Sequence, residues 1–198
     1  MLATLFKERT VGAERRKELF EDLMQRSYRP AYSLALRLTA NSAEAEDLVQ
    51  ETFVRAYRFF HRYDESLPFT NWLYRIMSNA HIDAVRRKGR LKTTSLEQPA
   101  PNGTSTLELP DLCATPDRVM LDQTMDENVQ AALMTMTPEF RTAVLLADVE
   151  GMAYEEIADV MNTSVGTVRS RIHRGRKQLR GFLVKRCPNA YGGLTDEL

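Results

Sequence analysis

The chain has 198 residues, of which 43% are hydrophobic, with 27 Lys and Arg and 27 Asp and Glu side chains. This length predicts one large domain or two small ones, and the composition excludes a wholly disordered chain, a collagen-like repeat and a coiled-coil rod. No apolar run approaches the roughly 18 residues that cross a bilayer, and the N-terminus lacks the apolar stretch of a signal peptide. Cys113 and Cys187 are too few for a disulfide framework, which favours a reducing, cytoplasmic compartment.

The net charge of zero conceals a pattern along the chain. Residues 119–168 carry nine acidic side chains and one basic one, whereas residues 169–198 carry eight basic and two acidic side chains. Two solvated helix faces would explain this pattern, and so would a basic element that is presented to a polyanion. Charge alone leaves both interpretations open.

Apolar side chains at helical spacing predict three helices in the first part of the chain. They cover residues 14–39, 43–60 and 70–88, and a turn-rich loop over residues 61–69 precedes the third. Pro30 predicts a kink or a break in the first helix.

Residues 89–117 are rich in Pro, Gly, Ser and Thr and show no amphipathic period, which predicts a flexible linker. So long a structureless stretch is unusual inside one compact domain. We therefore expect two domains, over residues 1–88 and 118–186, and a poorly ordered tail over residues 187–198.

The second domain is expected to contain four helices, over residues 118–136, 138–149, 153–161 and 165–185. No stretch alternates with period two for long enough to indicate a strand. The predicted fold class is all-α, with two small helical domains.

The last two predicted helices have the dimensions of a helix-turn-helix. On a helical wheel of residues 165–185, apolar side chains gather on one side and polar, mostly basic side chains lie opposite. Arginine binds guanine edges in bidentate fashion and lysine suits phosphates, so this face is predicted to enter the major groove of DNA. The predicted contacts are Arg169, Ser170, His173, Arg174 and Lys177. A solvated basic helix is the alternative.

Two pairs of motifs resemble extracytoplasmic-function sigma factors of the sigma-70 superfamily. Residues 150–158 (EGMAYEEIA) and 166–176 (GTVRSRIHRGR) resemble region 4 of that family. Residues 45–53 (AEDLVQETF) resemble region 2, as do residues 72–76 (WLYRI) with the downstream Asn79 and DAVRR sequence. Both motif sets occur in the family's order, and the resemblance covers roughly residues 15–186.

The resemblance implies that the helix with the DLVQE motif docks on a coiled coil of the largest subunit of bacterial core RNA polymerase. The side chains expected at that contact are Asp47, Gln50, Glu51, Val54 and Arg55. A mixed polar and apolar strip suits a non-obligate protein interface. Judged from the residues alone, a solvated helix face would explain this strip better.

The resemblance also implies that residues 63–88 melt the promoter and read its −10 element, while residues 165–185 read the −35 element. Flipped bases need a pocket that stacks on them and hydrogen-bonds them. The expected contacts are Phe69, Trp72, Tyr74, Arg75, Asn79, Arg86 and Arg87. Trp72 fits core packing better than a pocket wall. The linker would thread through polymerase toward the RNA exit path.

No catalytic constellation, metal site or cofactor motif emerges from the sequence. His61, His81 and His173 lie in different elements, and neither cysteine has a histidine nearby in sequence. The prediction is therefore a sigma factor that is not an enzyme and has no small-molecule substrate. Family members are commonly held inactive by an anti-sigma factor, often membrane-anchored, so such a partner is expected too. The alternative is a helix-turn-helix regulator that binds duplex DNA alone and uses residues 1–88 as a sensor or for dimerisation.

Overall fold

The computed structural model of the protein describes residues 2–93 and 125–191, with side chains placed for residues 14–88 and 125–191. Within these ranges every regular element is a helix, so the all-α prediction is confirmed. None of the helices in the described part of the chain is long and apolar enough to cross a membrane.

Domain 1 consists of α1 (Leu2–Thr39), α2 (Ser42–Phe59), the short 3-10 helix η1 (Phe60–Arg62) and α3 (Phe69–Thr93). The first helix begins well before residue 14, where the sequence pattern predicts its start. It continues through Pro30, so the prediction of a break at this proline is wrong. Asn41 caps α2 by accepting a hydrogen bond from the Glu44 backbone N–H at 3.0 Å. The third helix continues past Lys88, into the start of the segment predicted as linker.

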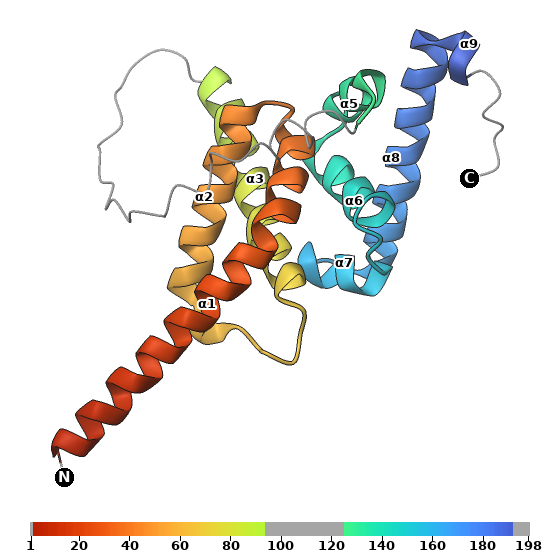
Figure 1. Ribbon diagram of the computed structural model, residues 1–198. Coiled ribbons are helices and arrows are strands. Elements are labelled where there is room, and N and C mark those ends of the chain that lie inside the picture. The colour runs from red at the N-terminus through yellow and green to blue at the C-terminus, as the bar shows by residue number, and fades with distance from the viewer. Residues whose placement is uncertain (1, 94–124, 192–198) are drawn as a thin grey trace.

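The core of domain 1 forms where α1, α2 and α3 pack on one another (Figure 1). Leu34 and Leu38 of α1 and Leu73 and Met77 of α3 are fully buried there. At the η1 end an aromatic cluster extends this core, and Trp72 is partly buried within it. The Trp72 ring centroid lies 5.3 to 6.3 Å from those of Phe60, Tyr63 and Phe69.

Domain 2 consists of α5 (Glu127–Met134), α6 (Pro138–Asp148), α7 (Tyr154–Val160), α8 (Val165–Arg186) and α9 (Pro188–Tyr191). The helix expected over residues 118–136 begins only at Glu127, and residues 118–124 lie outside the described part. Gly151 has a φ of +66°, a left-handed conformation that suits the turn after α6. Part of the predicted tail is helical in α9, and residues 94–117 of the predicted linker are not described.

Gly175 allows α8 to pack closely on α6. A Cβ atom at this position would lie 2.5 Å from Cγ2 of Val144 and 3.5 Å from the Phe140 carbonyl oxygen. Any larger side chain would therefore push the two helices apart, and with them the exposed face of α8.

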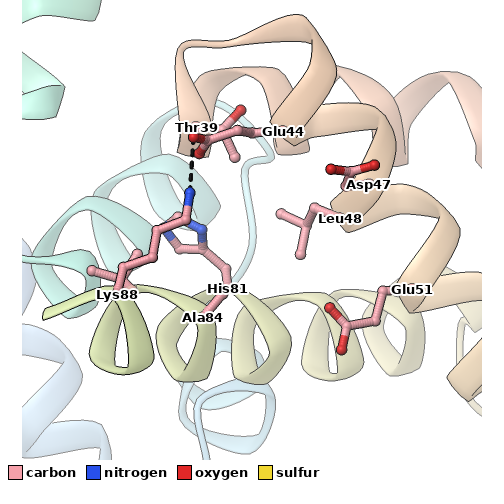
Figure 2. A pocket seen from close by; sticks show the side chains of 9 residues that line it. Thr39, Glu44, Asp47, Leu48, Glu51, His81, Ala84 and Lys88 are labelled. Carbon is pink, nitrogen blue, oxygen red and sulfur yellow. Dashed lines mark hydrogen bonds and ion pairs between the residues drawn. The ribbon is translucent and has the colours of Figure 1, made fainter. Parts of the chain in front are cut away.

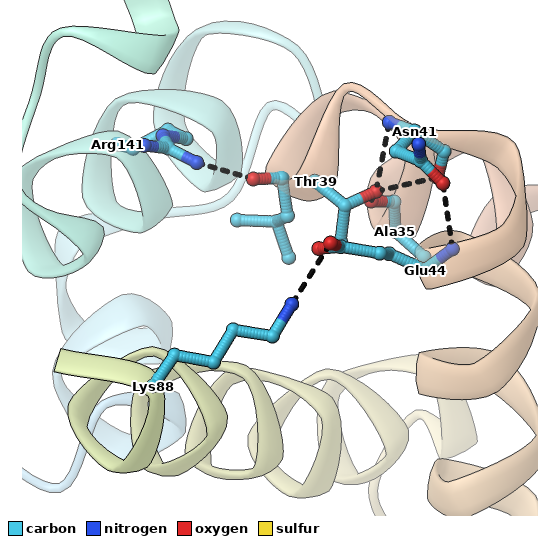
Figure 3. Close-up of polar contacts among 7 residues, drawn as sticks. Ala35, Thr39, Asn41, Glu44, Lys88 and Arg141 are labelled. Carbon is cyan, nitrogen blue, oxygen red and sulfur yellow. Dashed lines mark hydrogen bonds and ion pairs between the residues drawn. The ribbon is translucent and has the colours of Figure 1, made fainter. Parts of the chain in front are cut away.

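The two domains pack against each other and share one continuous hydrophobic cluster. Helices α6 and α7 contact α3, while α5 and α6 contact α1 (Figure 1). Arg141 of α6 is only 6% exposed and joins the domains at this junction. It donates hydrogen bonds to the carbonyls of Leu133 and Met136 in its own domain. It also donates to the carbonyl of Leu38 in α1 (Figure 3). Burial lowers the pKa of this guanidinium from its ordinary value.

Candidate nucleic-acid and protein interfaces

The helix α8 presents the basic face that the sequence predicts. Ser164 begins the helix by accepting a hydrogen bond from the Thr167 backbone N–H at 3.2 Å. Val168 and Ile172 are buried against the rest of domain 2. The five predicted DNA contacts are all exposed on α8: Arg169, Ser170, His173, Arg174 and Lys177. In Figure 1, α8 stands at the edge of the molecule, beside α5 and α6.

Arg176 is held differently from the other basic side chains of α8. Its guanidinium forms a two-pronged ion pair with Asp148 of α6, at 3.1 and 2.5 Å. The hydrogen bonds to Asp148 raise the pKa of Arg176 above its ordinary value. This pair links α8 to α6, so Arg176 stabilises the orientation of the exposed basic face.

The helix α2 carries the predicted polymerase contacts. Asp47 and Gln50 are exposed, whereas Glu51, Val54 and Arg55 are half-buried. Glu51 and Arg55 form an ion pair of 2.5 Å along the helix. The strip combines an exposed carboxylate, an exposed amide, an ion pair and an apolar side chain, a mixture that suits a reversible protein contact.

Beside this strip, a cavity of about 190 Å³ lies between α2 and α3 (Figure 2). Its lining includes Asp47 and Glu51 of the predicted strip, together with Glu44, His81 and Lys88. Lys88 spans its rim and pairs with Glu44 at 2.8 Å. His81 is only 4% exposed, and its Nε2 has no hydrogen-bond partner. The sequence gives no sign of this cavity, because its lining comes from three separate helices.

The structure divides the predicted −10 contacts into two groups. Phe69 and Tyr74 are 5% and 4% exposed and belong to the hydrophobic cluster, where Trp72 is partly buried. The four polar members of the set are exposed along α3: Arg75, Asn79, Arg86 and Arg87. The exposed members lie where a DNA backbone could reach them, whereas the aromatic members lie within the packing of the protein.

Domain 2 supplies acidic partners to α3 that sequence reasoning missed. The Tyr74 hydroxyl donates a hydrogen bond to Glu150 at 2.6 Å, and Glu150 also lies 3.8 Å from the Arg37 guanidinium of α1. Burial and the Glu150 contact raise the pKa of Tyr74. Asn71 donates to Glu156 at 2.8 Å.

Nearer the C-terminal end of α3, Arg86 pairs with Glu139 of α6 at 3.1 Å. The partners in the three hydrogen-bonded pairs that α3 forms with domain 2 are 53 to 85 residues apart in the chain. No local pattern in the sequence could therefore have paired them.

Two family descriptions match the chain, one in each domain. Residues 23–91 match "Sigma-70 region 2", which covers most of α1, all of α2 and nearly all of α3. Residues 126–179 match "Sigma-70, region 4", which covers α5 to α7 and most of α8.

Curated relatives agree with both matches. The chain is 41% identical over 166 residues to the ECF RNA polymerase sigma factor SigE of Mycolicibacterium smegmatis, an alignment that covers 84% of this chain and 62% of that protein. It therefore spans less than two thirds of SigE. It is 31% identical over 165 residues to the ECF RNA polymerase sigma factor SigW of Bacillus subtilis, covering 83% of this chain and 88% of SigW.

Solved structures share the fold. The sigma factor RpoE of Bartonella quintana, solved in complex with the anti-sigma factor NepR, superposes with a TM-score of 0.62 at 24% identity, covering 83% of this chain and 96% of that one. CnrH, solved with the cytosolic domain of CnrY, gives a TM-score of 0.57 at 24% identity, covering 89% and 97%. The two region matches cover most of the described helices, and the two relatives are 41% and 31% identical over more than four fifths of the chain. The chain therefore belongs to the extracytoplasmic-function sigma factors of the sigma-70 family, which is not a class of enzymes.

Proposed function

We propose that this protein binds bacterial core RNA polymerase and directs it to a set of promoters. The observation that carries the proposal is that one chain presents two separate surfaces of the required kinds. One is the mixed strip on α2, and the other is the exposed basic face of α8. A regulator that binds DNA alone would need only the second surface.

The α8 face is proposed to read the −35 element in the major groove. Arg169 and Arg174 offer the forked donors that match guanine edges, while Ser170, His173 and Lys177 suit phosphates and smaller base contacts. The packing of Val168, Ile172 and Gly175 and the pairing of Arg176 with Asp148 position this face without occupying it.

The exposed side of α3 and the loop before it are proposed to capture the −10 element as single-stranded DNA. Arg75, Asn79, Arg86 and Arg87 offer hydrogen bonds and positive charge along the helix. The aromatic cluster that contains Trp72 lies at the start of the same helix, where an unstacked base could pack.

The strip on α2 is proposed to dock on the largest polymerase subunit. Further elements of the proposal are a cytoplasmic location, the absence of catalytic activity and control by an anti-sigma factor. One solved structure supports the last element, because RpoE of Bartonella quintana was co-crystallised with the anti-sigma factor NepR.

Run-off transcription tests the proposal. Purified bacterial core polymerase is incubated with a genomic fragment library, with and without the protein. New discrete start sites with a shared upstream element are the expected result. Sequence-specific binding to duplex DNA by the protein alone, without new start sites, would instead identify a conventional regulator.

A pair of double variants tests the docking strip. Asp47→Ala with Gln50→Ala is expected to weaken binding to core polymerase, because it removes both exposed polar side chains. Asp22→Ala with Gln25→Ala is a matched control, since it removes the same residue types at the same spacing from an exposed face of α1. Equal polymerase affinity of the two variants would show that the strip is not the docking surface.

A further inference from the structure

The contacts between the domains fall on a helix that the proposed function needs for DNA. Asn71, Tyr74 and Arg86 lie on one side of α3, within about a third of the helix circumference. Each contacts a glutamate of domain 2, namely Glu156, Glu150 and Glu139 respectively. We call these three pairs, with the Arg37 contact to Glu150, the acidic seam. Tyr74 and Arg86 are also predicted −10 contacts.

Every acceptor in the acidic seam is a carboxylate from the acidic part of domain 2. A carboxylate offers an arginine or a hydroxyl the same kind of charged acceptor as a DNA phosphate. Residues 119–168, which carry a net charge of −8, thus supply the groups that lie against α3. The chain places its own anionic surface where the proposed function requires an anionic ligand.

The acidic seam combines exposed and buried contacts. Arg86 is largely exposed while it pairs with Glu139, and exposed pairs of this kind contribute little to stability. Glu150 and Arg37 are mostly buried, with side chains 15% and 18% exposed, and Tyr74 is buried beside them. Access of DNA to Tyr74 therefore requires the two domains to separate.

We propose that in the free protein the acidic side chains of domain 2 act as an internal competitor for the −10 face of α3. The acidic seam covers Tyr74, and Glu139 occupies the guanidinium of Arg86 as its ion-pair partner. Single-stranded DNA therefore binds this face only after Glu139 and Glu150 have moved away. This inference rests on the proposed function, because it takes α3 as the −10 reader. It adds that the helix-turn-helix domain restrains that reader.

Charge reversal at the seam tests the inference on the full chain. The seam variant Glu139→Lys/Glu150→Lys replaces both carboxylates with like charges that repel Arg86 and Arg37. The control variant Glu127→Lys/Glu155→Lys makes the same change in net charge at exposed positions of domain 2 outside the seam. The milder Glu139→Gln/Glu150→Gln variant removes the charges while preserving hydrogen-bonding shape, and it serves if the reversed variant does not fold.

Two readouts are measured without polymerase. The first is the radius of gyration in solution by small-angle X-ray scattering, which is expected to rise in the seam variant alone. The second is the affinity for a short fluorescein-labelled single-stranded DNA, measured by anisotropy. The seam variant is expected to bind about tenfold more tightly than the wild type, a usual size for coupled sites. The control is expected to gain about twofold or less, from charge alone.

Several results would overturn the inference. Equal gains in the seam and control variants would mean that net charge explains the DNA affinity. An expanded seam variant without tighter DNA binding would mean that the seam does not cover the DNA-binding face. An unchanged radius would mean that these glutamates do not hold the domains together. Failure of the wild type to support transcription with core polymerase is a separate result, which would count against the proposed function.

Discussion

Mild acid is expected to destabilise the protein through His81. This side chain of α3 is 4% exposed and lines the cavity beside α2, and its Nε2 has no hydrogen-bond partner. The charged groups around it are Glu44, Lys88, Glu139 and Arg141. Burial is the largest effect on the ring, followed by the positive charge of Arg141, and together they lower the pKa of His81 to about 4.

The size of the loss in unfolding free energy follows from the difference between the pKa of His81 in the folded and in the unfolded chain. An unfolded chain protonates this histidine near its ordinary pKa of about 6.5, whereas the folded chain does so only near pH 4. Above about pH 6.5 the ring is neutral in both states, and its burial costs the folded state nothing in protonation. As the pH falls toward 4, the unfolded chain takes up a proton that the folded chain does not, so the unfolding free energy falls. Between about pH 7 and pH 5 the loss in unfolding free energy is about 2 kcal/mol.

Urea unfolding near pH 7 and near pH 5 measures this loss. His81→Leu is expected to reduce the difference between the two pH values by about 2 kcal/mol, since a neutral side chain takes up no proton. His61→Gln serves as the control, because it removes a histidine from an exposed position of the same chain. An equal fall in stability for the wild type and His81→Leu would refute the reasoning.

Three further predictions concern α8. Gly175→Ala should lower the unfolding free energy by about 1–3 kcal/mol through the clash with α6, whereas Gly181→Ala, with no atom within 4 Å, should raise it by up to about 1 kcal/mol. Ser164→Ala should cost about 1 kcal/mol of stability through its lost N-cap, and an unchanged melting temperature would contradict this. Arg174→Ala should cost about 1–3 kcal/mol of binding free energy for the promoter and should relax the base preference at one position of the −35 element. Lys177→Ala should weaken binding to all DNA sequences alike and reduce the slope of log affinity against log salt concentration by about one. Mobility-shift titrations over base-substituted promoters distinguish the two effects.

Features that repeat along the chain could be predicted from the sequence. The 3.6-residue period of Val168, Ile172 and Gly175 predicts which side of α8 is buried, and Ser164 predicts where the helix begins. The ends of helices follow less directly from the sequence. The helix α3 continues beyond Gly89 to Thr93, although the glycine alone predicts an end, because the helical cost of one glycine is only about 1 kcal/mol. Pro30 likewise lies inside α1 without interrupting it.

Contacts between distant segments could not be predicted in this way. The family resemblance points to α3 as a DNA reader, yet nothing in its sequence shows that Tyr74 is buried against Glu150. Arg141 looks like one surface charge in an acidic segment, although its guanidinium caps carbonyls of both domains. Such pairings depend on how the two domains dock. That arrangement has no period and no fixed spacing along the chain.

The acidic seam joins two parts of a single chain, and this lowers the intrinsic affinity that the two surfaces need in order to stay in contact. A tether of this kind keeps its two ends at an effective mutual concentration on the order of millimolar. The same two surfaces on separate molecules could bind with a millimolar dissociation constant and still be closed about half of the time when joined. A seam built largely of polar pairs can therefore dominate in the free protein. A partner with micromolar affinity for the open form would nevertheless displace it readily.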